Sequence, residues 1–108
     1  MTVRMEVKAL IVDPIANMPV VILRDSEEKS FLPIWVGVFE ANAIALQLEG
    51  IETPRPMTHD LLKNTISRLH ASVDRVVITK LHENTFYAEV HLVTAGGPVV
   101  VDSRPSDA

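Results

Sequence analysis

Apolar and polar residues alternate along the first part of the chain. The apolar positions on one face are Val3, Met5, Val7, Ala9 and Ile11. A repeat of two residues is the pattern of a strand that buries one face, so we expect a strand over residues 2–12. Turn residues follow at Asp13, Pro14 and Asn17, and the segments PVVIL and SFLPIWV then flank the charged segment RDSEEK. These patterns predict an antiparallel meander of three strands.

The hydrophobic repeat changes to that of a helix between residues 38 and 49. The apolar residues on one helical face are Val38, Ala41, Ile44, Ala45 and Leu48. Gly50 follows at the position where a left-handed residue commonly ends a helix. Pro54 and Pro56 lack N–H groups, so we expect extended chain there. A second helix is predicted over residues 59–70, with the inward-facing residues Leu61, Leu62, Ile66 and Leu69.

Three further strands are expected in the second half of the chain. Their segments are VDRVVITKL, TFYAEVHLV and PVVVD. The turns expected between them are His82-Glu83-Asn84 and Ala95-Gly96-Gly97. Ser106 and Asp107 then follow Arg104-Pro105 in the manner of a third helix start. The whole pattern predicts an α+β fold with about six mainly antiparallel strands, two complete helices and a truncated third helix start.

Length and composition indicate a single globular domain. The chain has 108 residues, of which 47% are hydrophobic and 22% charged. No apolar run approaches the roughly 18 to 20 residues of a membrane span, so we expect no membrane partner. The N-terminus does not have the pattern of a secretory signal, which favours a cytoplasmic protein. Because cysteine is absent, any metal must be held by O or N ligands.

The charge balance limits how this chain can meet a nucleic acid. Its formal net charge is −4 at pH 7, so the overall field repels a polyphosphate and any binding of RNA or DNA must be local. Aromatic residues make up 5% of the chain, which argues against an extended stacking surface. We therefore expect Trp35 and Phe39 in the core or in a dimer interface.

Four blocks of residues resemble the bifunctional nuclease domain, a family widespread in bacteria and known also from plant proteins. In chain order they are LPIWVGVFEANAIALQLEG, RPMTHDLL, VVITKL with TFYAEV, and VDSRPSDA. The resemblance covers nearly the whole chain and implies hydrolysis of RNA and DNA with little sequence preference. In that family the last block normally continues into an Ile-Ala-Leu helix and a short Pro-Ile strand. Both are absent here, so we expect residues 1–108 to form a single domain that lacks its C-terminal helix and strand.

Several polar residues suit the chemistry of phosphodiester hydrolysis. The reaction needs an activated water, stabilisation of negative charge on phosphorus and usually a divalent cation held by carboxylates. The catalytic candidates are His59, Asp60, Asp102 and Asp107, with Glu40 as a further carboxylate. His59 suits a general base or a metal ligand, and Asp60 and Asp107 suit Mg²⁺ or Mn²⁺. The structural alternative is that the three helix-start carboxylates only interact with helix dipoles and that His59 is an exposed first-turn residue.

Two Arg-Pro pairs each precede an expected helix start. Arg55 precedes Thr58, the expected N-cap of the second helix, and Arg104 precedes Ser106. Arginine matches the geometry of a phosphate and a helix N-terminus offers free N–H groups. These four residues are therefore candidates for one substrate-binding site, and we expect the two pairs to lie side by side.

The arginines also allow a purely structural interpretation. Arg104 can pair with Asp60, or Arg55 with Asp102, which would hold the two Arg-Pro segments together without a substrate. The remaining histidines are expected at the surface and not as ligands: His70, His82 and His91.

Two functions of different classes stay open at this point. The first is a metal-assisted nuclease that acts on RNA and DNA. The alternative is a non-enzymatic dimeric interaction scaffold or a small-anion-binding module, which the acidic charge balance favours. In either case we expect a homodimer that forms through an edge strand or an uncovered sheet face. Carboxylates within reach of one metal ion would favour the enzyme, and carboxylates consumed by arginine pairs would favour the scaffold.

Overall fold

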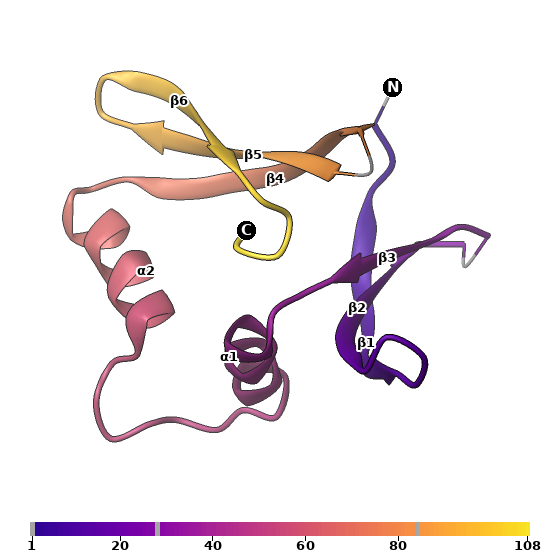
Figure 1. Ribbon diagram of the computed structural model, residues 1–108. Helices are drawn as coiled ribbons and strands as arrows, with labels where there is room; N and C mark the ends of the chain where they lie inside the picture. Colours follow the sequence, from indigo (N-terminus) through magenta and orange to yellow (C-terminus); the bar gives the residue numbers. More distant parts are fainter. Residues whose placement is uncertain (1, 28, 84) are drawn as a thin grey trace. The chain divides into compact units, whose positions relative to one another are not determined.

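The computed structural model describes residues 2–27, 29–83 and 85–108 (Figure 1). Its elements follow one another as β1–β2–β3–α1–α2–β4–β5–β6. The chain divides into two compact units, one running to Glu52 and the other from Thr53 to Ala108. Each unit contains one helix and one antiparallel sheet of three strands. Neither helix in these ranges has the length and apolar character needed to cross a lipid bilayer.

The first sheet consists of β1 (Met5–Asp13), β2 (Met18–Asp25) and β3 (Phe31–Trp35), in that order. Both strand pairs are antiparallel, which confirms the predicted meander. The register of β1 shifts at Lys8, where a bulge adds one residue opposite β2.

The turn between β1 and β2 is held by the carboxylate of Asp13. Its Oδ1 accepts the backbone N–H groups of Ile15 at 2.9 Å and Ala16 at 3.3 Å. The indole Nε1–H of Trp35 donates to Oδ2 at 3.4 Å, which connects the turn to β3. The backbone hydrogen bonds, with that from Ile15 the strongest cause, hold the pKa of Asp13 below its ordinary value of 3.8.

The helix α1 (Val38–Leu48) packs against β2. It ends as the sequence predicts, because Gly50 adopts a left-handed φ of 68°. The N–H of Gly50 donates to the carbonyl of Gln47 at 3.2 Å, and that of Ile51 to Leu46 at 3.0 Å. These two bonds form a Schellman motif, which satisfies carbonyl groups that a helix end leaves free.

The second unit begins with α2 (Thr58–Arg68), followed by the strands β4 (Ser72–His82), β5 (Thr85–Thr94) and β6 (Gly97–Ser103). All three strands are antiparallel in the order β4–β5–β6. The Ala95-Gly96-Gly97 turn is confirmed, with Gly97 at a φ of 114°. Asn84, which was expected in the other turn, lies outside the described residues.

The two units differ in how much apolar surface they bury. Among the residues that the structure describes, the buried apolar residues of the first unit are Val20, Val21, Ile34, Val36 and Ala41. In the described part of the second unit the buried apolar residue is Ala88 on β5. The expectation that α2 turns its leucines inward is wrong, because Leu61, Leu62 and Leu69 are 61%, 61% and 73% exposed. A helical repeat predicts an apolar face, but what covers that face depends on residues far along the chain.

The six antiparallel strands form two separate sheets, in line with the two predicted meanders. One part of the predicted fold needs correction: the third helix start is wrong because residues 105–107 form a turn. The carbonyl of Arg104 accepts the N–H of Asp107 at 3.0 Å, three residues on, and also the hydroxyl of Ser103 at 2.8 Å. A helix would pair that carbonyl with an N–H four residues on. The segment therefore closes as a turn.

Candidate functional site

The start of α2 carries the carboxylate that organises its first turn. Met57 occupies the N-cap position, so the expectation that Thr58 is the N-cap is wrong; Thr58 is the first helical residue. The Oδ2 of Asp60 accepts the N–H of Met57 at 3.0 Å. This hydrogen bond satisfies one of the N–H groups that a helix start leaves free and fixes the orientation of the carboxylate.

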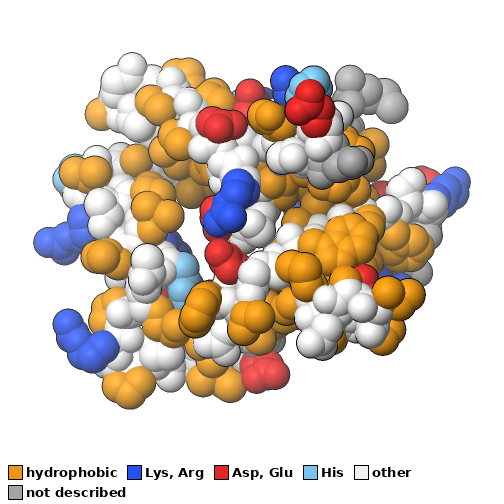
Figure 2. Space-filling model, viewed as in Figure 1, with side chains coloured by type: hydrophobic (Ala, Val, Ile, Leu, Met, Phe, Trp, Pro, Cys, Tyr) orange, Lys and Arg blue, Asp and Glu red, His pale blue; other side chains and the backbone are white. Residues whose placement is uncertain are grey.

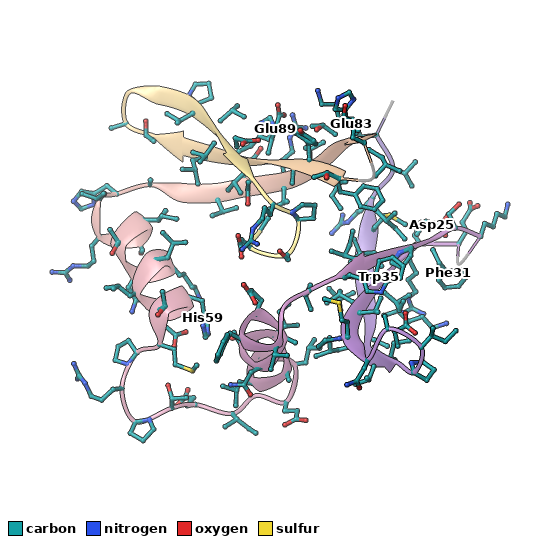
Figure 3. All side chains as sticks on the ribbon, viewed as in Figure 1. Asp25, Phe31, Trp35, His59, Glu83 and Glu89 are labelled. Carbon is teal, nitrogen blue, oxygen red and sulfur yellow. The ribbon has the colours of Figure 1, made fainter. Side chains whose placement is uncertain are left out.

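His59 and Asp60 form a neighbouring pair at this helix start (Figure 3). The Nε2 of His59 lies 3.4 Å from the Oδ1 of Asp60, and the two side chains are 42% and 38% exposed. Because Met57 engages Oδ2, the other carboxylate oxygen is left to face the imidazole. A carboxylate that orients a solvent-accessible imidazole is the arrangement of an acid–base pair.

The segment before α2 is shaped by a side chain of its own. The hydroxyl of Thr53 donates to the carbonyl of Arg55 at 2.7 Å. Arg55 itself is exposed, as expected for a side chain that would meet a substrate. No helix or strand includes Pro54 and Pro56, but the chain bends at Pro54 and Arg55, so the expectation of extended backbone is wrong at these two residues.

The turn after β6 brings together Arg104 and Asp107. The Nε of Arg104 donates to the Oδ2 of Asp107 at 2.8 Å, and its Nη2 lies 2.7 Å from the same oxygen. These side chains are 68% and 43% exposed. Ser106 lies between them in sequence and is half-buried. The structure thus pairs Arg104 with a carboxylate of its own turn, and the predicted pairing of Arg104 with Asp60 stays a prediction.

The predicted site residues lie in the second unit, apart from Glu40. The carboxylate of Glu40 folds back against Gly37, the N-cap position of α1. The contacts of Asp60 and Asp107 described above are local to a helix start and a turn. The expectation that the two Arg-Pro segments lie side by side stays a prediction.

A metal ion would need several donor side chains close together in space. Within residues 2–27, 29–83 and 85–108, no group of three or more His, Cys, Asp or Glu side chains lies close enough to hold a metal ion. The predicted ligands Asp60 and Asp107 each accept hydrogen bonds from a neighbouring donor instead.

Sequence reasoning missed a polar cluster on the second sheet. Asp102 on β6 lies directly opposite Glu89 on β5, and the Oε1 of Glu89 lies 3.1 Å from the Nε2 of His91. His91 was expected at the surface; its side chain is 22% exposed, so it reaches the surface but is partly covered. Alternate residues of a strand share a face, which was the available signal for pairing Glu89 with His91. That Asp102 belongs to the same cluster is known only from the register between β5 and β6, which places it opposite Glu89.

A third histidine–carboxylate pair lies at the turn end of β4. The Nε2 of His82 is 3.8 Å from the Oε1 of Glu83, and these side chains are 62% and 85% exposed. The imidazole also meets the ring of Tyr87 edge-on, with 6.5 Å between ring centroids. This pair confirms the expectation that His82 lies at the surface, and it offers a chemical control for His59.

Comparison with known proteins gives a match over most of the chain. Residues 21–108 match the family described as the bifunctional nuclease domain. Two uncharacterized proteins of Mycobacterium tuberculosis, MT1877 of strain CDC 1551 and Rv1829 of strain H37Rv, are each 45% identical over 92 residues. Each alignment covers 85% of this chain and 54% of the relative, so the chain spans about half the length of the curated relatives it matches.

Proposed function

Because the chain belongs to the bifunctional nuclease domain family, we propose that it hydrolyses phosphodiester bonds of RNA and DNA with little sequence preference. The observation that carries this proposal is the family match over residues 21–108. The geometry at the start of α2 supports it, since this stretch contains a histidine oriented by a fixed carboxylate. A cytoplasmic location stays a prediction.

In the proposed reaction His59 acts as the general base. In this proposal Nε2, which lies 3.4 Å from the Oδ1 of Asp60, carries the hydrogen of the neutral imidazole, and Nδ1 accepts the proton. A water oxygen attacks phosphorus while its proton passes to Nδ1. The phosphorus–oxygen bond to the leaving sugar breaks, and the leaving oxygen takes a proton from solvent. Asp60 stabilises the imidazolium that forms.

The substrate phosphate is placed at the N-terminus of α2 in this proposal. The first N–H groups of a helix have no partner within it, and the helix dipole favours an anion there. Arg55 and Thr58 lie just before and at this start and supply a guanidinium and a hydroxyl. The candidate residues at the end of β6 and in the turn after it can contribute to this phosphate site only if that turn adjoins the start of α2. They are Asp102, Arg104, Ser106 and Asp107.

The requirement for Mg²⁺ or Mn²⁺ stays a prediction. Mg²⁺ is commonly held by one or two carboxylates together with phosphate oxygens of the substrate, which is the role proposed for Asp60 and Asp107. Hydrolysis measured with and without a chelator tests this requirement directly.

The decisive experiment compares two histidines that each have a neighbouring acid. His59→Gln and His82→Gln are purified by the same procedure as the wild type and incubated with fluorescein-labelled single-stranded RNA and DNA. We expect His59→Gln to lower kcat by roughly 100- to 10,000-fold, the usual contribution of a general base. His82→Gln should retain wild-type activity, because its pair with Glu83 is wider and more exposed.

The same cleavage assay of wild type, His59→Gln and His82→Gln can also contradict the proposal. If wild type and His59→Gln cleave at equal rates, the activity comes from a contaminant or from another residue, and His59 is not the base. His91→Gln then identifies whether the pair with Glu89 does this work. If no variant or wild-type sample cleaves either substrate, the nuclease proposal fails.

We also propose the second candidate function, a dimeric interaction module, because Asp107 is engaged by Arg104. The strand β6 is an edge strand of its sheet, and its residues Val99, Val100 and Val101 are 44%, 51% and 45% exposed. An apolar edge strand favours pairing with another strand. Light scattering should show a dimer that Val100→Lys converts to a monomer, and a wild-type monomer at high concentration would exclude this module.

A further inference from the structure

One face of the first sheet carries aromatic side chains on its edge strand. Phe31, Pro33 and Trp35 occupy alternate positions of β3 and so share a face, which we call the aromatic face. Phe31 is 50% exposed and Trp35 is 49% exposed. Figure 2 shows hydrophobic side chains gathered over β3, and Figure 3 labels both aromatic residues there. Trp35 was expected in the core or in a dimer interface; the core placement is wrong, and the dimer interface stays a prediction.

The indole of Trp35 is held in place although half of it is exposed. The indole Nε1–H donates to the Oδ2 of Asp13 at 3.4 Å. Trp35 lies opposite Val20 in the register of β2 and β3. Val20 is 3% exposed and provides a rigid base next to the ring. A ring held at its edge is preorganised for stacking, because it loses little rotational freedom when a ligand binds.

Cations lie at the other end of the aromatic face. The Nζ of Lys8 lies 4.7 Å from the centroid of the Phe31 ring. Arg24 is directly opposite Phe31 in the register of β2 and β3, and Glu6 lies opposite Arg24 on β1. The face thus combines two exposed aromatic rings with a basic end near Phe31.

From this geometry we infer that the aromatic face binds single-stranded nucleic acid by base stacking. The inference rests on the proposed function and deepens it, since it names single strands as the substrate class. Alternate residues of a strand are roughly 6.6 Å apart, so Phe31, Pro33 and Trp35 offer three successive contacts for neighbouring bases. Sheets that bind RNA use aromatic residues in this way to stack two or three bases.

The charge of the chain favours this mode over binding of a duplex. With a net charge of −4, the chain lacks the long-range attraction that non-specific duplex binding needs. Every base offers a ring surface when it is unpaired. In a duplex the same surfaces are already stacked. Lys8, which lies over the ring of Phe31, is the cation proposed to meet the phosphate next to a base at Phe31.

The test uses Trp35 as its own reporter, because it is the single tryptophan of the chain. The full chain is titrated with a ten-nucleotide oligothymidylate, the corresponding oligouridylate and a hairpin duplex, with chelator present to prevent hydrolysis. We expect both single strands to quench the tryptophan emission and the duplex to have little effect. Phe31→Ala should weaken binding of the single strands roughly 5- to 100-fold.

Matched variants separate stacking from general surface effects. Phe39→Ala removes an aromatic residue that is 87% exposed on α1, outside the sheet, and should leave the affinity unchanged. Lys8→Gln should lower the slope of log affinity against log salt by about 0.7, the value for one phosphate contact on a single strand. Trp35→Phe, measured by anisotropy of a labelled oligothymidylate, keeps a ring at that position and should bind within a few-fold of wild type.

The outcomes distinguish this inference from the proposed nuclease activity. Quenching by single strands without hydrolysis supports the aromatic face and removes the nuclease proposal. Hydrolysis without quenching, or equal losses in Phe31→Ala and Phe39→Ala, overturns the aromatic face and leaves the nuclease proposal standing. A tryptophan emission that shifts with protein concentration alone, and not with oligonucleotide, would show that two copies of the chain meet here and would also overturn it.

Discussion

The two units contain the same parts in a different order and with different burial. In the first unit the sheet precedes α1, which packs on β2 and buries Ala41. In the second unit α2 precedes the sheet and has no buried residue. Thus α2 has the stronger amphipathic pattern, but α1 is the better-packed helix. Packing depends on whether a sheet face lies within reach of the apolar side chains, which for α1 is the face of β2.

The largest expected difference in stability is between two alanine variants, one that truncates an apolar residue of the first unit and one that truncates an apolar residue of the second. Ile34→Ala removes a side chain that is 6% exposed and should lower the free energy of unfolding by about 2 to 5 kcal/mol. Leu62→Ala removes one that is 61% exposed and should change it by less than about 0.5 kcal/mol. Urea denaturation followed by circular dichroism measures both. Equal losses would mean that α2 is as well packed as the first sheet.

The helix ends offer a cleaner comparison. Both helices close with the same Schellman bonds, but the left-handed residue is Gly50 after α1 and His70, at a φ of 62°, after α2. Gly50→Ala should cost about 1 kcal/mol, and since no atom lies within 4 Å of the added Cβ, the cost is conformational. His70→Gly should stabilise by about 1 kcal/mol.

Thermal denaturation of both variants and of the double variant tests this reciprocal expectation. The double variant should return close to the wild-type stability, because the two sites lie in different units. A stabilised Gly50→Ala, or a destabilised His70→Gly, would mean that the side chains and not the backbone angles decide these helix ends.

A smaller effect is expected from the carboxylates that face each other on the second sheet. Glu89 and Asp102 are directly opposite, and like charges in that position destabilise a sheet. Asp102→Asn should therefore raise the free energy of unfolding by about 0.2 to 1 kcal/mol at neutral pH. Asp74→Asn is the control, because Asp74 lies at a register shift of β4 without a strand partner. A loss of stability in Asp102→Asn would show that its charge is paired.

The smallest effect concerns the turn of the first sheet and depends on pH. The N–H groups of Ile15 and Ala16 keep the pKa of Asp13 below 3.8, so its contribution to stability is complete above that pH. It is lost as the pH falls through the lowered pKa of the folded state. Trp35, which donates to the same carboxylate, should report this as a change of emission. Asp13→Asn should abolish the pH step, and an unchanged step in that variant would assign it to another group.

Local patterns predicted much of the fold because they act between near neighbours in sequence. The alternation over residues 2–12, the helical repeat before Gly50 and the turn around Gly96 each appear in the structure close to the predicted places. The third helix start failed for a local reason as well. Ser103 and Asp107 both bond to the carbonyl of Arg104, and this competition among near neighbours cannot be weighed from residue preferences alone.

The candidate site was only partly accessible to the same reasoning. The neighbouring pair of His59 and Asp60 follows from the start of α2, where a carboxylate in the first turn accepts a backbone N–H. The cluster of Glu89, His91 and Asp102 did not, because it depends on which residue of β6 lies opposite β5. A shift of one residue in that register would turn Asp102 to the other face.

The sequence by itself determined the type and order of the elements, the left-handed Gly50 and the adjacency of His59 and Asp60 at a helix start. These properties depend on hydrogen bonds and side-chain preferences within a few residues. The tertiary structure decided that the two meanders form separate sheets, that Trp35 is half exposed, that Lys8 lies over the ring of Phe31, and that Arg104 pairs with Asp107. Strand register, the covering of apolar faces and the choice among carboxylate partners depend on which groups meet in space, and a linear pattern does not contain that information.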